Sequence, residues 1–193
     1  MLTEKLKNYN LILASGSPRR QELLKELTAD FRIEKKSVNE SFPADLQASE
    51  ISDYLCLVKA AAFQNLNPED LVITSDTIVW FKGKALGKPK NYQEGFAMLR
   101  DLSGQKHEVI SSVCFKTHTF KKVIHDTTEV WFKKLSREEI DFYLNTYQPF
   151  DKAGSYGIQE WIGFIGVEKL IGSYFNVMGF PTHLVYKTLL EIL

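Results

Sequence analysis

The feature that most constrains this chain is a short apolar run that passes through a small-residue turn into an amphipathic run. Residues 10–14 are a β-strand candidate, and residues 18–28 place leucines on one stripe of a helix. Between them, Ser17 suits the N-cap position and Pro18 suits the first helical turn. We therefore expect a strand, a tight turn and a helix start. Free N–H groups, the helix dipole and the two arginines after the proline would attract phosphate there.

Strand and helix patterns alternate along the rest of the chain. Asn91 and Ser136 are each followed three residues later by glutamate, which predicts two capped helix starts. The order of elements favours an α/β protein with a mixed sheet, in a single domain over residues 1–193 with two lobes and a cleft. Further strands are expected at 31–35, 71–81, 107–118 and 121–133, and further helices at 49–64, 91–103, 136–147 and from 181 onward.

Composition excludes several classes of function. Of 193 residues, 24 are Lys or Arg and 24 are Asp or Glu, so the formal net charge is zero and neither a nucleic-acid nor a membrane-surface partner is expected. No apolar run approaches the ~20 residues needed to span a bilayer. Cys56 and Cys114 have no metal-like spacing and no secretory signal precedes them, so we expect reduced thiols in a cytoplasmic protein. The four histidines are scattered and form no ligand pattern.

Asp76 is the residue most suggestive of chemistry. It lies inside an apolar strand candidate, where a carboxylate is costly unless it is paired, hydrogen-bonded or metal-bound. A structural role as a turn cap at the strand end is one interpretation. A metal ligand or general base at a cleft is the other, and the apolar context favours it.

Other polar segments are ambiguous by themselves. Residues 83–89 superficially resemble a phosphate loop, but the glycine spacing is one short and Pro89 stands where serine or threonine would bind magnesium. A hairpin turn with solvated lysines is as good an interpretation, although Lys88 before the proline is held extended as a fixed charge. The glycine-containing segments 151–159 and 171–181 are either tight turns or places where the backbone approaches a ligand.

Five of these segments together resemble the Maf family of nucleoside triphosphate pyrophosphatases. They occur in the family's order and cover nearly the whole chain. The matching segments are residues 15–24 (SGSPRRQELL), 75–79 (SDTIV), 87–89 (GKP), 152–159 (KAGSYGIQ) and 172–179 (GSYFNVMG).

The resemblance implies a fold, a reaction and roles for particular residues. The fold is that of the inosine-triphosphatase superfamily, and the reaction is hydrolysis of a nucleoside triphosphate to monophosphate and pyrophosphate, clearing unwanted nucleotides from the pool. A divalent cation, Mg²⁺ or Mn²⁺, and a homodimer are also implied. The motifs look most like those of the dTTP/UTP-preferring subgroup. By this resemblance Asp76 is the proton acceptor, Arg19, Thr77 and Gln159 bear on base selection, Glu40 and Asp76 hold the metal, and Ser15, Arg20, Lys59 and Lys88 handle phosphate.

Two departures from the family pattern affect these expectations. Asn39 stands where the family usually has an aspartate, which removes one carboxylate from the expected metal shell. Glu160 and Trp161 follow Gln159 where the family normally has glycine, so a charge and a bulky ring are expected beside the base pocket. The alternatives that remain open are a non-enzymatic nucleotide-binding regulator of septum formation and a phosphatase that releases orthophosphate.

Overall fold

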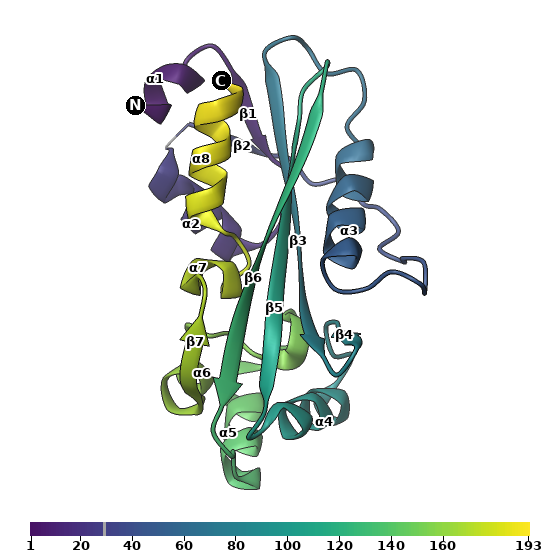
Figure 1. The fold of residues 1–193 in the computed structure, drawn as a ribbon, viewed down its shortest axis with the longest axis vertical. Coiled ribbons are helices and arrows are strands. Elements are labelled where there is room, and N and C mark those ends of the chain that lie inside the picture. Colours follow the sequence, from purple (N-terminus) through teal and green to yellow (C-terminus); the bar gives the residue numbers. More distant parts are fainter. Residues whose placement is uncertain (29) are drawn as a thin grey trace.

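A seven-stranded mixed sheet flanked by helices forms the centre of the protein (Figure 1). The computed structural model describes residues 1–28 and 30–193. The strand order is β2-β1-β3-β5-β6-β7, and β4 pairs with β3. The strands are β1 (Asn10–Leu13), β2 (Arg32–Ile33), β3 (Asp70–Phe81), β4 (Lys84–Leu86), β5 (Lys106–Lys116), β6 (Lys121–Phe132) and β7 (Val167–Ile171).

Helices cover the sheet on both sides. In Figure 1, α3 lies on one side of the long strands, while α2 and α8 lie together on the other. The α-helices are α1 (Leu2–Leu6), α2 (Pro18–Leu27), α3 (Ser49–Ala61), α4 (Tyr92–Leu102), α5 (Arg137–Tyr147), α6 (Trp161–Gly166), α7 (Tyr174–Val177) and α8 (Thr182–Ile192), and a 3₁₀ turn spans Ala153–Ser155.

Three long strands connect the two ends of the molecule. β1 pairs in parallel with both β2 and β3. The pairs β3–β5, β5–β6 and β6–β7 are antiparallel. Figure 1 shows β3, β5 and β6 twisting through the length of the protein. The sheet is therefore one continuous scaffold shared by everything that packs on it.

Two main hydrophobic cores lie along this sheet. One contains Leu13, Leu24 and Phe115 and is covered by α1, α2 and α8; the other contains Leu99 and Tyr143 and is covered by α4 and α5. We call these the α2/α8 lobe and the α4/α5 lobe. Between them β3 carries the polar run 74–77, which is almost entirely buried. The hydrophobic packing along the sheet is therefore interrupted at its middle by these polar residues.

Most predicted elements are confirmed to within a few residues, with two local differences. The strand expected at 31–35 shortens to β2, since only two of its residues pair with β1. The helix expected to reach residue 64 ends at Ala61. Residues 82–83 form the turn of the β3–β4 hairpin, both with positive φ (48° and 75°), so the hairpin interpretation of this segment is correct.

The helix caps differ from one another. Ser136 and Glu139 form the complete reciprocal capping box. Asn91 accepts from the Glu94 N–H, but the Glu94 carboxylate accepts from the Lys90 N–H instead of closing the box. Ser17 occupies the N-cap position of α2 and Pro18 its first turn, as predicted, but the Ser17 side chain makes no capping hydrogen bond.

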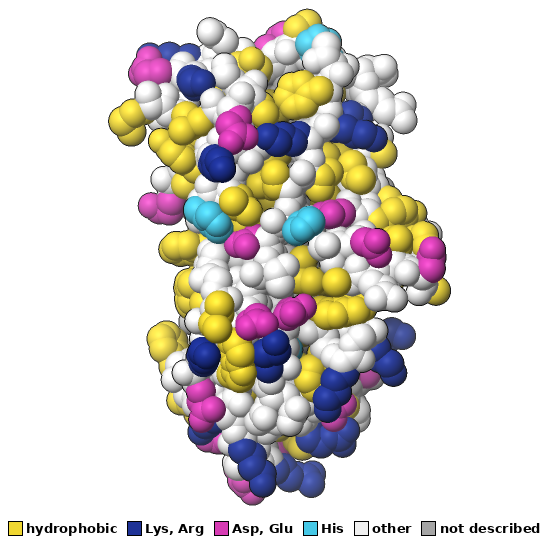
Figure 2. Space-filling model, viewed as in Figure 1, with side chains coloured by type: hydrophobic (Ala, Val, Ile, Leu, Met, Phe, Trp, Pro, Cys, Tyr) yellow, Lys and Arg dark blue, Asp and Glu magenta, His cyan; other side chains and the backbone are white. Residues whose placement is uncertain are grey.

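The remaining composition-based expectations concern surface, thiols and membrane. Acidic and basic side chains are interspersed over the face shown in Figure 2. Both cysteines are buried free thiols, and burial raises the pKa of Cys114 to about 11. Within the described part of the chain, the helices are too short or too polar to cross a membrane.

Candidate functional site

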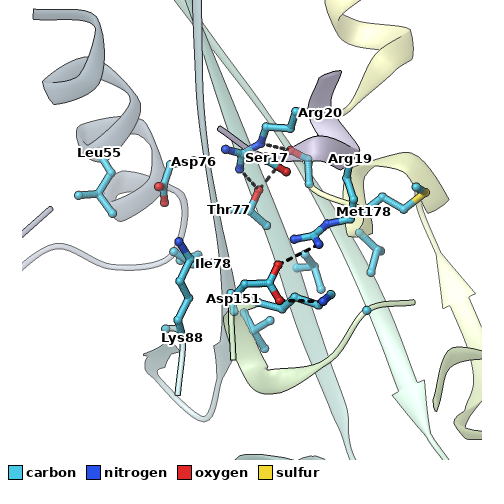
Figure 3. Close-up of a pocket in the computed structure, with 18 of the residues that line it drawn as sticks. Ser17, Arg19, Arg20, Leu55, Asp76, Thr77, Ile78, Lys88, Asp151 and Met178 are labelled. Atoms are coloured by element: carbon cyan, nitrogen blue, oxygen red, sulfur yellow. Dashed lines mark hydrogen bonds and ion pairs between the residues drawn. The ribbon is translucent and has the colours of Figure 1, made fainter. Parts of the chain in front are cut away.

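A cavity of about 370 Å³ opens at the polar middle of the sheet, between the two lobes (Figure 3). It is lined from α2, α3, β3, the β4–α4 connection, the segment before α6 and the turn after α7. A second cavity of about 240 Å³ adjoins it around the turn between β1 and α2. Both cavities are lined by Ser17, Arg19, Arg20, Glu40, Lys59, Lys88 and Asp151.

The second cavity is strongly basic. Six basic and two acidic side chains line it. An excess of cationic side chains in a concave site, beside the start of a helix, attracts a polyanion such as a phosphate chain. The basic residues are Arg19, Arg20, Lys35, Lys36, Lys59 and Lys88.

Asp76, Lys59 and Glu40 meet where the two cavities join. The Lys59 Nζ lies 2.5 Å from Asp76 Oδ1 and 3.2 Å from Glu40 Oε1. Burial by itself raises the pKa of Glu40, but the charge and hydrogen bond of Lys59 outweigh it and the pKa is lowered overall. Asp76 is only 8% exposed, so its cost of burial is offset by this pairing. The strand register places it there, since Asp76 pairs with Ser112 in mid-sheet.

The same two carboxylates fit a hard divalent cation. Glu40 and Asp76 converge on one ammonium group, which shows that their oxygens reach a common cationic position. In the part of the chain that the structure describes, no cluster of three or more acidic, histidine or cysteine side chains could hold a metal alone. Mg²⁺ commonly uses one or two carboxylates and completes its shell with water and substrate phosphates, so two donors suffice.

Arg20 holds three elements together. Its guanidinium donates to the carbonyls of Gly179 (2.9 Å) and Ser75 (3.0 Å) and to the Thr77 hydroxyl (2.9 Å). Desolvation by burial lowers its pKa, and the nearby Asp76 charge acts in the opposite direction. An arginine has five N–H donors, so part of the fork remains for a ligand in the cavities that Arg20 lines. Its first effect is to join α2, β3 and the turn before α8.

The Thr77 hydroxyl is engaged by protein groups. Besides accepting from Arg20, it lies 2.8 Å from the Ser111 hydroxyl. The resemblance implies a role for Thr77 in base selection, and the geometry shows that any such role acts alongside its contact with Arg20.

The middle of the segment 172–179 is held to the sheet by the side chain of Asn176. The fully buried Asn176 amide donates to the Val109 carbonyl at 3.0 Å and to the Thr128 hydroxyl at 2.9 Å. These bonds fix α7 on β5 and β6, and they place Gly179, whose φ is 105°, against Arg20. The segment forms a short helix and a turn, and because Met178 and Gly179 line the larger cavity, the approach of its backbone to a ligand stays a prediction.

Arg19 and Gln159 face the larger cavity. Arg19 Nη1 lies 3.2 Å from Asp151 Oδ2, and Figure 3 shows the two side chains meeting there. Gln159 Oε1 is buried and has no hydrogen-bond partner among the described residues. A buried acceptor without a partner is costly, so a turn of the amide that brings this oxygen to a ligand donor in the cavity would be favourable.

Lys88 and Ser15 complete the predicted set. Lys88 lines both cavities and points toward Asp76 in Figure 3. Ser15 lines only the second cavity, and its Oγ accepts from the Ser17 N–H at 3.2 Å, which shapes the turn before α2. Every candidate residue predicted from the sequence therefore lies at one or both cavities.

The structure adds residues that the sequence reasoning missed. Asp151 and Lys152 line the larger cavity, and the adjacent opposite charges at the start of a glycine-containing segment were the available signal. Lys35 and Phe42 also contribute, and nothing in their local pattern indicated it.

The departures from the family pattern have different outcomes. The Trp161 ring packs against Phe142 with centroids 4.8 Å apart and does not line the cavity, so the expected bulky ring beside the base pocket is wrong. Glu160 lies behind the cavity wall, where its carboxylate binds Lys152 and accepts from Tyr143. The Asn39 side chain accepts from the Ser41 N–H at 3.0 Å, and its expected effect on metal affinity stays a prediction.

A mixed sheet with a basic double cavity and a shared carboxylate pair at its centre defines an α/β protein that receives a polyanionic ligand. The chain belongs to the Maf family, since it matches the family of Maf-like proteins over residues 10–192. It is 56% identical to a dTTP/UTP pyrophosphatase of Flavobacterium psychrophilum, over 99% of this chain and 98% of that protein. A second dTTP/UTP pyrophosphatase, from Flavobacterium johnsoniae, is 55% identical over 98% of both chains.

A solved structure shares the fold. The HAM1 protein of Coxiella burnetii superposes with a TM-score of 0.51 over 95% of this chain and 99% of that one, at 15% sequence identity. The mixed sheet flanked by helices is thus shared with that protein, which agrees with the fold expected from the sequence.

Proposed function

We propose that this protein hydrolyses dTTP and UTP to the monophosphate and pyrophosphate. The relatives that carry this activity in their names match almost the whole chain at up to 56% identity. The observation that carries the proposal is the Asp76–Lys59–Glu40 group at the junction of a large cavity and a basic one. A base and sugar fit the former, and a triphosphate chain fits the latter.

The reaction needs a positioned water and relief of charge. A nucleoside triphosphate carries about four negative charges, which repel a nucleophile at the α-phosphorus. Lys59, Lys88 and the start of α2 offset that charge in the ground state and as it develops. Asp76 orients the attacking water and accepts its proton, within reach of the α-phosphorus. A divalent cation held by Glu40 and Asp76 would supply further charge neutralisation and a polarised water.

For base selection we propose the Gln159 amide, which lines the larger cavity and turns its unpartnered oxygen toward the bound base. Uracil and thymine present a donating N3–H between two carbonyl acceptors. Gln159 Oε1 accepts from that N3–H, and the free Arg19 donors serve a carbonyl. Cytosine has an acceptor at N3, so it would leave two acceptors facing each other, which a buried site penalises strongly.

Product analysis with an Asp76 variant tests the proposal. Wild-type protein incubated with UTP or dTTP and Mg²⁺ or Mn²⁺ is expected to release monophosphate and pyrophosphate. Asp76→Asn keeps the side-chain shape but removes the proton acceptor, so turnover should fall ~10²–10⁴-fold. Asp101→Asn, on the exposed side of α4, is the matched control and should retain wild-type turnover.

Three results would contradict the assignment. Near-normal turnover by Asp76→Asn removes Asp76 from the proton-accepting role. Orthophosphate as the product indicates a phosphatase. Nucleotide binding with no turnover under any metal condition favours the non-enzymatic regulator.

We also propose that the protein is a cytoplasmic homodimer. The support is the family resemblance, together with two buried thiols that form no disulfide in the structure. Light scattering coupled to size-exclusion chromatography is expected to give twice the 22.2 kDa chain mass, and a mass of one chain would contradict the dimer.

A further inference from the structure

A continuous chain of charged side chains runs along the wall of the larger cavity and ends behind it. Arg19 Nη1 lies 3.2 Å from one oxygen of Asp151, and Lys152 Nζ lies 2.8 Å from the other. The same Nζ lies 3.0 Å from Glu160 Oε1. The orientation of Arg19, which faces the cavity, is therefore tied through two intermediates to a carboxylate that does not line it.

The second oxygen of Glu160 supports the turn that carries Gln159. It accepts from the Tyr143 hydroxyl, which in turn accepts from the Gly157 N–H at 3.0 Å. A Cβ at Gly157 would lie 2.9 Å from the Glu160 carboxyl carbon and 3.0 Å from Gln159 Nε2. The turn, the carboxylate and the glutamine amide are thus packed in direct contact, with no room for even a methyl group.

The Lys152–Glu160 pair is largely buried, so the loss of either charge would leave the other charge buried without this partner. The Lys152 and Glu160 side chains are 9% and 19% exposed, whereas Asp151 is 59% exposed. Burial raises the pKa of Asp151, but the hydrogen bonds and charges of Lys152 and Arg19 outweigh it and lower the pKa overall. Without the Glu160 charge, the nearly buried Lys152 ammonium would have Asp151 as its single anionic partner, in competition with Arg19.

We propose that Glu160 is a positioning residue for pyrimidine selectivity, one oxygen fixing Arg19 through Lys152 and Asp151 and the other fixing the Gln159 turn through Tyr143. The inference rests on the proposed function, because it concerns the two residues that read the base. Misplacement of such groups by about 1 Å is enough to weaken recognition. Glu160 touches neither the base nor the reacting phosphate, so it affects discrimination more than the chemical step.

The test compares UTP with CTP, which differ only on the edge that Arg19 and Gln159 face. Glu160→Gln is expected to lower the ratio of kcat/KM for UTP to that for CTP about tenfold, chiefly through KM. The kcat for UTP should stay within about threefold of wild type. Glu168→Gln, the same change at an exposed position of β7, is the control and should leave the ratio unchanged.

A second variant keeps the test decisive if the first one folds poorly. Lys152→Met combined with Glu160→Gln removes both charges of the pair, so no uncompensated ammonium is left buried. It also removes the support of Asp151, and the same loss of selectivity is expected. A folded variant of either kind that keeps the UTP/CTP ratio within about twofold of wild type overturns the inference, as does an equal loss of kcat for both nucleotides.

Wild-type protein assayed in parallel separates this inference from the proposed function. Absence of any UTP preference in wild type contradicts the proposed function and the inference with it. Preserved preference in a folded Glu160 variant contradicts the inference alone.

Discussion

At the residue scale, two adjacent arginines at the same cavities have different hydrogen-bond partners. Arg20 donates to three protein oxygens, whereas Arg19 pairs with Asp151, although both side chains are half-buried and line both cavities. Neighbouring positions on a helix point about 100° apart, so one side chain turns into the sheet and the other along its opening. The sequence resemblance divided them between phosphate and base, and the geometry adds a structural task for Arg20.

Gln159 provides the prediction at this scale. Gln159→Ala removes the acceptor that has no partner in the described structure. We expect the ratio of kcat/KM for UTP to that for CTP to fall at least about tenfold, with a smaller change in overall rate, because the N3–H of uracil loses its acceptor. Steady-state kinetics on both nucleotides measure it.

Gln93→Ala on the exposed surface of α4 is the matched control. An unchanged ratio in Gln159→Ala would exclude this side chain from base recognition.

At the element scale, the start of α5 is capped and contributes to stability, whereas the start of α2 is uncapped and lies at the basic cavity. The α5 start is closed by the Ser136–Glu139 box. At α2 the Ser17 side chain makes no capping hydrogen bond. The backbone N–H of Ser17 donates to the Ser15 hydroxyl at the edge of the basic cavity. The uncapped start of a helix keeps N–H donors available to an anion.

The two serines therefore respond differently to the same substitution. Ser136→Ala should lower the free energy of unfolding by ~1 kcal/mol, the usual value of an N-cap bond. Ser17→Ala should change it by less than about 0.5 kcal/mol, because no cap bond is lost. Urea unfolding of both variants measures the difference, and an equal loss in the two would show that Ser17 caps α2 in solution.

At the scale of the whole molecule, the site lies where the packing of two lobes is interrupted. β3, β5 and β6 pass through both cores, and their polar middle supplies Asp76, Thr77 and Ser111. A shared sheet should make each lobe depend on the other, as the single domain predicted from the sequence over residues 1–193 requires. The cavity takes residues from both lobes, so a bound nucleotide would contact both.

Core substitutions test that dependence. Leu24 and Leu99 are fully buried, one in each lobe. Leu24→Ala and Leu99→Ala are each expected to lower the free energy of unfolding by ~2–5 kcal/mol in a single cooperative transition. Near-UV and far-UV circular dichroism during thermal unfolding should report the same midpoint in each variant. Two separated transitions in either variant would show that the lobes are independent domains.

The sequence by itself determined the local elements and the list of candidate groups. Periodicity and turn chemistry act over a few residues, so β3, β5, β6 and the Ser136 capping box were predictable from the chain alone. The motif order identified the family, and the predicted site residues all lie at the cavities.

Only the tertiary structure decided how those groups are used. Arg20 meets Gly179 across 159 positions of the chain, and Arg19 meets Asp151 across 132. Glu160, expected beside the base pocket, instead lies behind the cavity wall, where it binds Lys152 and accepts from Tyr143. Such contacts depend on sheet order and packing, which bring distant residues together, and no local pattern encodes which buried partner satisfies which charge.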